Sequence, residues 1–213
     1  TGAGAWSDDT LARAIREGVG HDGRGLGGLM WWWSFRFLAD EDLASIVAYL
    51  RSVPAVRNAL PKRILSAEQE RERAARARPL TTRVPARDLT DPVERGRYLL
   101  DIADCAGCHS AWEAPINAGI FAGGNRIERL GEASFSANLT PDAAALGAWS
   151  AEIFSTILRT GRGGTLRSAM PWAAYRHMTD EDLGAIYLAL REVPPVRHLV
   201  TNLAPPTACA VCG

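Results

Sequence analysis

The sequence predicts an all-α fold. Two helices are bounded by matching signals, because a serine N-cap opens each (Ser7 and Ser150) and a glycine stop closes each (Gly18 and Gly161). No succession of strands joined by hairpin turns is recognisable. The segments between the helices are long, so loops complete the expected fold.

An internal repeat predicts the domain organisation. Residues 4–7, Gly-Ala-Trp-Ser, recur at 147–150, and the similarity continues at an offset of 143 and then, after a three-residue difference in a loop, of 140. A repeat of this length indicates duplication of a unit. We expect residues 1–58 to be the C-terminal half of a first domain and residues 92–200 to be a complete second domain. The matched pairs are Trp6 with Trp149, Gly18 with Gly161, Met30 with Met170, Trp32 with Trp172, and 40–43 with 180–183.

Residues 59–91 are predicted to link the two copies. Ser66 to Arg78 has helix-forming composition but almost no apolar face, which favours a solvated linker helix over a partner site. Residues 79–90 are expected to be extended. Residues 201–213 form a tail that contains proline and cysteine.

The second copy opens and closes with a helix. Asp91 resembles an N-cap with Pro92 at the first helical position, so a helix is expected over 92–104. Gly96 within it indicates close crossing by another helix, for which Tyr187 is the candidate contact. Acidic residues open the last helix, at 180–191, where Thr179 and Asp182 resemble a capping box.

Composition narrows the class of protein. Lys+Arg and Asp+Glu number 24 each among 213 residues, which is typical of a soluble globular chain. No extended basic patch predicts nucleic-acid binding. No apolar run approaches the roughly 18 residues of a membrane span, and no signal peptide is recognisable.

The strongest motif is Cys105-Ala106-Gly107-Cys108-His109, a Cys-x-x-Cys-His sequence. This spacing is typical of covalent haem c attachment, in which two thiols form thioethers with the porphyrin vinyl groups and the following imidazole ligates the iron. A structural disulfide, a thioredoxin-like pair and half of a zinc site are the alternatives. The surrounding helical pattern argues against thioredoxin, and a zinc site needs ligands that the sequence does not supply nearby.

A second cysteine pair lies in the tail. Cys209 and Cys212 are followed by Gly213 rather than by histidine, so a third haem is not expected. In an oxidising compartment a local disulfide is the default interpretation, and a reduced pair is the alternative.

The chain resembles c-type cytochromes, and more narrowly the multihaem cytochrome c subunits of bacterial periplasmic dehydrogenases. The resemblance covers nearly all of 92–200 and, more loosely, 4–58. It implies the cytochrome c fold and a dehydrogenase as electron donor. The residues that carry it are 94–99, 105–109, 121–124 (Phe-Ala-Gly-Gly), 137–142 (Ala-Asn-Leu-Thr-Pro-Asp), 147–150, 170–172 (Met-Pro-Trp) and 178–183.

The sixth iron ligand is predicted from the repeat. Met170, Met178, His177 and His198 are the candidates downstream of His109, and Met170 alone has an equivalent of the same type, Met30. Met178 is expected to be a core residue. By the same correspondence we expect a second haem c near Met30, delivered by another Cys-x-x-Cys-His before Thr1.

Four further residues are candidates for haem contacts. Trp149 is either a core aromatic residue or an indole N–H donor to a propionate. Asn138 is either a turn-former or a polar haem contact. Arg159 and Arg162 are candidates for ion pairs with propionates.

The repeat is the basis for expecting two haems. The predicted axial ligands are the basis for expecting an electron carrier. A His/Met pair leaves no open coordination site, which favours electron transfer from a dehydrogenase to a cytochrome, oxidase or photosynthetic reaction centre. The alternatives are a dihaem peroxidase or thiol-oxidising enzyme, and a docking subunit with one functional haem. Haem c implies export, so a periplasmic location, peripheral to a membrane complex or free, is expected.

Overall fold

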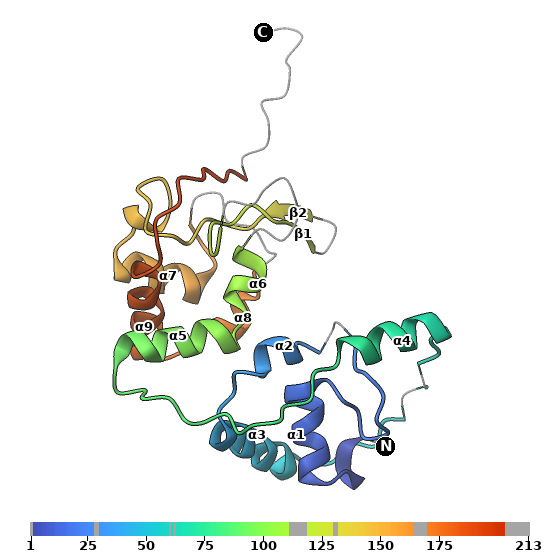
Figure 1. Cartoon of the computed structure of the whole chain (residues 1–213). Helices are drawn as coiled ribbons and strands as arrows, with labels where there is room; N and C mark the ends of the chain where they lie inside the picture. Colours follow the sequence, from blue (N-terminus) through green and yellow to red (C-terminus); the bar gives the residue numbers. More distant parts are fainter. Residues whose placement is uncertain are drawn as a thin grey trace, which may run out of the picture. The chain divides into compact units, whose positions relative to one another are not determined.

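The computed structural model describes residues 2–27, 30–59, 61, 63–110, 119–129, 132–163 and 170–202. This part of the chain is mainly helical, in agreement with the all-α prediction (Figure 1). It also contains one two-stranded sheet. The chain divides into two compact units: unit 1 comprises Thr1–Arg87 with Asp101–Ala103, and unit 2 comprises Asp88–Leu100 with Asp104–Gly213. None of the described helices combines the length and apolarity needed to span a bilayer.

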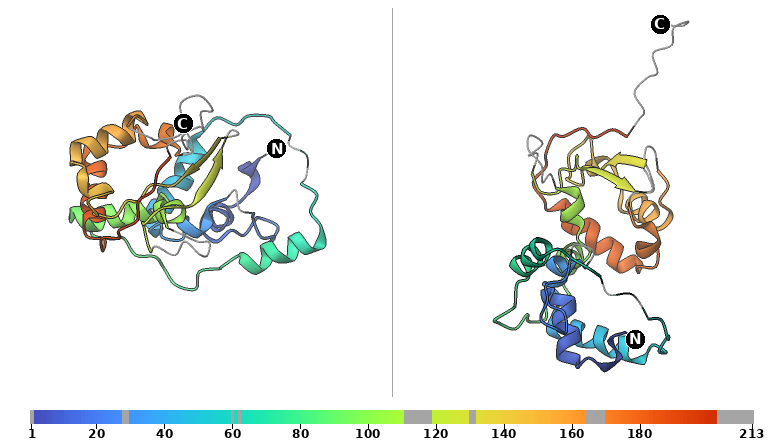
Figure 2. Two further views of the ribbon diagram at one scale, coloured as in Figure 1. Left: turned by 90° about the horizontal axis from the view of Figure 1, so that it is seen from above. Right: turned by 90° about the vertical axis from the view of Figure 1, so that its right-hand side faces the viewer.

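Unit 1 is built on α1, which packs against α2 and α3 (Figures 1 and 2). The Ser7 hydroxyl accepts the Thr10 N–H at the start of α1, and Gly18 ends it with φ 69°. Leu11 and Ile15 of α1 form the core with Leu38, Leu43 and Val47. The elements are η1 (Ala3–Ala5), α1 (Asp8–Glu17), α2 (Trp32–Phe35), α3 (Asp40–Ser52) and α4 (Ala67–Arg76).

The charged helix α4 forms as predicted. Ser66 and Gln69 make a reciprocal capping box, and no residue of α4 is buried. The helix nevertheless contacts the loop after α1, because a Cβ on Gly25 would meet the Arg73 backbone and one on Gly27 would lie 2.5 Å from the Arg73 guanidinium. Glycine therefore permits this close approach.

Unit 2 repeats the arrangement of unit 1 and adds elements before it. Helix α7 packs against α8 and α9, as α1 packs against α2 and α3. The core contains Leu100, Phe121, Leu146, Phe154 and residues of α9. The elements are α5 (Pro92–Ile102), α6 (Cys105–His109), β1 (Arg126–Arg129), β2 (Glu132–Phe135), η2 (Leu146–Ala148), α7 (Ala151–Thr160), α8 (Trp172–Tyr175) and α9 (Asp180–Arg191).

Contacts as well as residues recur at the sequence offsets. A Cβ on Gly18 would lie 2.5 Å from Trp32, and one on Gly161 would lie 2.8 Å from Trp172. Both glycines are left-handed helix ends that leave space for a tryptophan from the following short helix. The same tryptophan-on-glycine packing thus closes the loop in each unit.

The predicted crossing at Gly96 occurs, but not through Tyr187. A Cβ on Gly96 would meet the Ala185 carbonyl of α9 and lie 2.7 Å from the Ala189 Cβ. Tyr187 instead donates its hydroxyl to the Trp149 carbonyl at 2.9 Å. Residues 185 and 189 lie one turn apart on one helix face, whereas 187 points elsewhere, and this explains the error.

The predicted cap of α9 is correct in part. The Asp182 N–H donates to the Thr179 hydroxyl at 3.1 Å. The Asp182 carboxylate, however, pairs with Arg95 of α5 at 2.7 Å rather than closing a capping box. A cation from another helix competes successfully for this carboxylate because the guanidinium offers a full positive charge and several donors, whereas the backbone amide is neutral and offers one.

A hairpin that the sequence did not predict joins β1 to β2. The strands are antiparallel, with Arg126 paired to Phe135 and Ile127 to Ser134. The signal was weak because each strand has only four residues and only one β-branched or aromatic residue, Ile127 in β1 and Phe135 in β2.

Candidate functional site

The Cys-x-x-Cys-His sequence forms a helix of its own, α6. Asp104 precedes it with φ 55°, a left-handed conformation that Asp tolerates, and so turns the chain from α5 into α6. A Cβ on Gly107 would collide with the Asp104 carboxylate, so this position has no room for a side chain. Cys105 and Cys108 lie three residues apart, which places them on one helix face.

His109 has the geometry of an axial ligand. Its Nδ1 lies 2.7 Å from the Ala137 carbonyl oxygen, which can only accept, so Nδ1 carries the proton. Burial lowers the pKa of His109, although the bond to Ala137 opposes this shift. Burial therefore favours the neutral form of the imidazole, and the proton on Nδ1 leaves a lone pair on Nε2 that can bind a metal.

A loop that is distant in sequence holds the end of α6. The Gly123 N–H donates to the His109 carbonyl at 2.6 Å, and the buried Asn125 amide donates to the Cys108 carbonyl at 2.7 Å. These bonds satisfy carbonyls that a short helix leaves without intrahelical partners. Sequence reasoning missed Asn125. The only signal for it was its position directly after the Phe-Ala-Gly-Gly stretch at 121–124.

The two thiols are not joined in a disulfide. Burial raises the pKa of Cys108, and the nearby Asp104 charge raises it further. Within the part of the chain that the structure describes, no cluster of three His, Cys, Asp or Glu side chains is placed to hold a metal ion. The haem interpretation of the motif stays a prediction. Cys209 and Cys212 lie outside the described residues.

The segment of Met170 reaches the neighbourhood of α6. Burial raises the pKa of Tyr175, and the charges of Cys105 and Cys108 raise it further, so α8 lies within electrostatic range of both cysteines. Met170 directly precedes α8, and its carbonyl accepts the Trp172 N–H at 2.9 Å. Met170 is partly buried and does not belong to the unit 2 core.

The other ligand candidates are occupied differently. Met178 packs against the unit 2 core, as expected for a core residue. His177 is exposed and accepts from Arg176 at 3.1 Å. His198 hydrogen-bonds through Nδ1 to the Ala122 carbonyl at 2.8 Å. The contacts of Met178 and His177 favour Met170 over these two candidates, whereas the Nδ1 bond of His198 is of the same kind as that of His109 and does not distinguish it. Ligation by Met170 stays a prediction.

A cavity of about 530 Å³ lies beside the support of His109. Its walls include Trp149, Ile153, Ile157 and Ala137, the residue whose carbonyl holds the imidazole. Cys105, Cys108, His109 and Met170 are not among the residues that line it, so its volume is no measure of a haem site. The residues of the motif fit haem c by ligand type and by helix geometry.

Trp149 and Asn138 both line this cavity but differ in what their polar atoms do. The Asn138 amide donates to the Val196 and His198 carbonyls, and its oxygen accepts twice from Thr140. All four bonding positions of this amide are used, which favours the turn-forming role. The Trp149 indole N–H has no hydrogen-bond partner among the described residues, so the propionate interpretation of Trp149 stays open.

Arg159 forms an ion pair whose equivalent is also present in unit 1. It pairs with Asp180 at 2.5 Å and donates to the Arg176 carbonyl, and Arg16 pairs with Asp40 at 2.6 Å in unit 1. The recurring ion pair ties the end of one helix to the start of the next, which gives no support to propionate binding by Arg159. Arg162 is exposed after α7, and its backbone N–H donates to the Thr160 hydroxyl.

Met30 belongs to unit 1, where it packs, partly buried, against the core. Trp32 is buried, whereas Trp31 and Trp33 are exposed. Trp6, the equivalent of Trp149, stacks on His21 with ring centroids 4.4 Å apart. Ligation of a second haem by Met30 stays a prediction.

Comparison with known proteins adds names to this geometry. No family model matches the chain. It is 37% identical over 126 residues to the fructose dehydrogenase cytochrome subunit of Gluconobacter japonicus, which covers 57% of this chain and 25% of that protein. It is 32% identical over 118 residues to the cytochrome c subunit of the quinone-dependent alcohol dehydrogenase of Gluconobacter oxydans, covering 53% and 23%.

A third relative is the gluconate 2-dehydrogenase cytochrome c subunit of Pantoea cypripedii, 37% identical over 100 residues, which covers 45% of this chain and 22% of that protein. The chain therefore spans about a quarter of the length of these relatives. All three are named as cytochrome subunits of dehydrogenases. The resemblance predicted from the motifs is thus confirmed, and the matched half of the chain is related to the cytochrome c subunits of bacterial dehydrogenases.

Proposed function

We propose that this chain is an electron-transfer c-type cytochrome that holds haem c through Cys105 and Cys108, with His109 and Met170 as axial ligands. The observation that carries the proposal is the bond between His109 and Ala137, which fixes the imidazole through Nδ1 and leaves the lone pair on Nε2. Bound haem c supplies a one-electron couple.

The residues of the chain position and protect that group. Helix α6 presents both thiols on one face, and Gly123 and Asn125 hold its last carbonyls. Ala137 fixes the imidazole plane, which keeps the axial ligand from reorienting when the iron changes charge. Because His and Met fill both axial positions, an electron carrier is favoured over a peroxidase or a thiol-oxidising enzyme.

The proposal includes a second haem c beside Met30. The support is the recurrence in unit 1 of the tryptophan-on-glycine packing and of the Arg16–Asp40 ion pair, both of which frame the equivalent Met170 loop in unit 2. A dihaem protein of this kind contains a second Cys-x-x-Cys-His upstream of residue 1. The native protein is then a multihaem subunit, as the predicted resemblance implies.

One of the proposed partners follows from the names of the relatives. The proposed donor is a dehydrogenase subunit, because the relatives are named as cytochrome subunits of dehydrogenases. The proposed acceptor, a cytochrome, an oxidase or a reaction centre, does not come from those names. The proposed location is the periplasm, because covalent haem attachment takes place on exported chains. Association with a membrane is through the complex.

One observation favours a second candidate function. Met30 packs against the unit 1 core, as expected if unit 1 is a docking half-domain that binds no haem. In this case the native subunit carries a single haem, at His109.

In-gel haem staining tests the first proposal. Wild-type protein should retain haem after denaturation, and the Cys105→Ala, Cys108→Ala double variant should lose the stain because both thioethers are removed. Cys209→Ala is the matched control, since it removes a thiol outside the motif, and it should stain as the wild type does. Complete extraction of haem from the wild type by acid acetone would rule out covalent attachment.

A further inference from the structure

Unit 1 contains a cavity of its own, of about 450 Å³, which is lined by α2, α4 and the loop after α1. Its apolar lining consists of Leu26, Trp32 and Trp33, and most of its polar lining comes from α4. None of the residues proposed to attach or ligate haem, Met30 included, lines this cavity. It is therefore a space that the proposed electron transfer does not use.

Helix α4 turns one face towards this cavity. Gln69, Glu72, Arg73 and Arg76 line it, and residues three, four and seven positions apart share one side of a helix. The sequence predicted a solvated linker helix, because α4 has almost no apolar face. A solvated helix, however, has no reason to direct two arginines at the same cavity, since like charges on one helix face repel each other.

Two guanidinium groups at this cavity are available to a ligand. The side chains of Arg73 and Arg76 have no hydrogen-bond or ion-pair partner among the described residues. Arg73 is partly buried, and Gly27 leaves room for it, because a Cβ there would lie 2.5 Å from the guanidinium. The third arginine of the lining, Arg78, is already engaged, since it donates to the Ala75 carbonyl at 2.9 Å.

The charges and the apolar residues of the lining define what the cavity can hold. Three arginines and one glutamate, Glu72, line it, so positive charge predominates and favours an anion. Trp32 and Trp33 meet edge to face, with ring centroids 5.9 Å apart and planes at 75°. Trp32 is buried, whereas Trp33 is 38% exposed, so part of its ring is open to contact with another ring.

We propose that this cavity binds an aromatic carboxylate, with its ring against Trp33 and its carboxylate on Arg73 and Arg76. A planar guanidinium matches the two oxygens of a carboxylate, and a bound anion removes the repulsion between the two arginines. An apolar lining with a few convergent charged groups is typical of small-molecule sites, and the volume lies in their usual range. The site is separate from the proposed haem chemistry, so either proposal can fail without the other.

Calorimetric titration of the purified protein with cinnamate tests the proposal. We expect binding at one site per chain that weakens as salt is added, because salt screens the charges. Arg76→Gln should weaken it roughly tenfold to a hundredfold, since it removes a charge-assisted hydrogen bond. Arg71→Gln is the matched control. It removes an equal charge from the same helix outside the cavity, and it should leave the affinity unchanged.

Two further ligands separate the ring from the charge. Cinnamyl alcohol has the ring without the carboxylate, and inorganic phosphate has charge without a ring, so both should bind more weakly than cinnamate. Phosphate binding as tight as that of cinnamate would indicate an adventitious ion only and overturn the proposal. Equal binding of the alcohol, or an equal loss in the Arg71 and Arg76 variants, would also overturn it. Because Arg76 is exposed, its variant should fold, and an unchanged helical circular dichroism signal checks this.

Discussion

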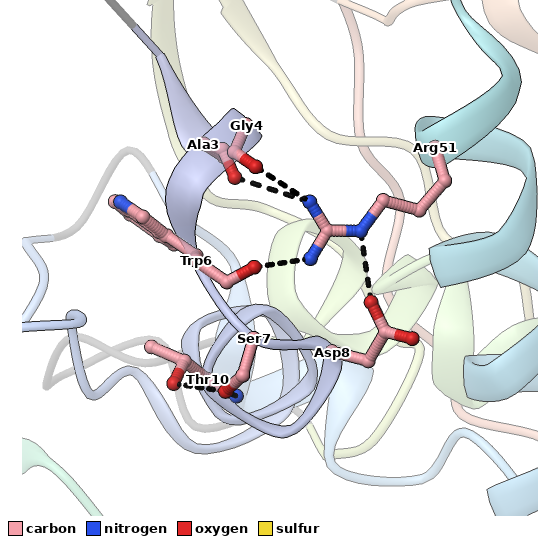
Figure 3. A network of polar contacts seen from close by, with 7 residues as sticks. All are labelled: Ala3, Gly4, Trp6, Ser7, Asp8, Thr10 and Arg51. Atoms are coloured by element: carbon pink, nitrogen blue, oxygen red, sulfur yellow. Dashed lines mark hydrogen bonds and ion pairs between the residues drawn. The ribbon is translucent and has the colours of Figure 1, made fainter.

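Hydrogen bonds connect the segment before α1 to α3 in unit 1 and the segment before α7 to α9 in unit 2, but the residues that make them differ. In unit 2 a single neutral bond does this, from the Tyr187 hydroxyl to the Trp149 carbonyl. In unit 1 the equivalent of Tyr187 is Val47, whose side chain has no hydrogen-bond donor. Arg51 donates to the Trp6 carbonyl instead (Figure 3).

Arg51 makes more of the contact than a substitute requires. Its guanidinium also donates to the Ala3 carbonyl at 3.2 Å and pairs with Asp8 at 2.8 Å, as Figure 3 shows. The comparison teaches that the fold needs the connection, not a particular residue. A buried helix makes it with one tyrosine in the core, and an open helix makes it with a charged network at the surface.

Leu190 of α9 is buried, whereas its equivalent in α3, Leu50, is exposed. Substitutions at these two positions should give the largest difference in stability. In residues 1–213, Leu190→Ala removes a fully buried side chain and should lower the free energy of unfolding by about 2–5 kcal/mol. Leu50→Ala should change the free energy of unfolding by no more than about 0.5 kcal/mol, because that side chain is already exposed to solvent. Urea unfolding of both variants measures this, and equal losses would break the comparison.

The two methionines of unit 2 should separate ligation from packing. Met170→Ala should abolish the weak sulfur-to-iron absorption band in the red and lower the reduction potential, since a thioether favours reduced iron. Met178→Ala should keep the band and cost up to about 2–5 kcal/mol, because Met178 packs against the core. Loss of the band in the Met178 variant instead would show that the ligand assignment is wrong.

The recurring ion pair should be stronger in unit 1, where it is more deeply buried and Arg83 joins it. Hydrogen bonds from Arg16 and Arg83 lower the pKa of Asp40 to about 2 from its usual 3.8. Its contribution to stability is therefore present above pH 3.8 and is lost as the pH falls through 2. Asp40→Asn should destabilise the protein at neutral pH but not below pH 2.

Asp180→Asn is the matched control for Asp40→Asn. It should cost about 0–1 kcal/mol, since Asp180 is exposed. Stability measured by urea unfolding from neutral pH down to the acid limit distinguishes the two variants. A pH-independent loss in the Asp40 variant would contradict the assigned cause.

A modest effect is expected from the hydrogen bonds that Tyr187 and Arg51 make to the carbonyls of Trp149 and Trp6. Tyr187→Phe removes one neutral hydrogen bond and should cost about 0.5–1.5 kcal/mol. Arg51→Met removes several exposed bonds, each of which competes with water, and should cost a similar amount. Thermal unfolding of the two variants checks this, and a loss for Arg51→Met several times that for Tyr187→Phe would show that the surface network is not equivalent.

Local signals in the sequence predicted the helix boundaries well, because a cap is settled within three or four residues. Ser7, Ser66, Ser150 and Thr179 all cap the helices expected to follow them. Long-range partners were not predictable in the same way. Asp182 binds Arg95 across 87 residues, and this choice depends on how α5 and α9 cross.

The candidate site shows the same division. Cys105, Cys108 and His109 were evident from their spacing, whereas the buried Asn125 amide that holds Cys108 was not, because an isolated asparagine more often marks a turn. Arg159 illustrates the same limit. Its charge was visible in the sequence, but its partner, Asp180, is brought to it only by the packing of α7 on α9.

Intact mass of residues 1–213, matured in a host that attaches haem c, tests the central claim most directly. The account predicts a chain that carries one covalent haem under denaturing conditions, located by digestion to the peptide that contains Cys105 and Cys108. The Cys105→Ala, Cys108→Ala double variant should have the mass of the bare chain. A wild-type chain without covalent haem, or with haem on Cys209 and Cys212, would contradict the account.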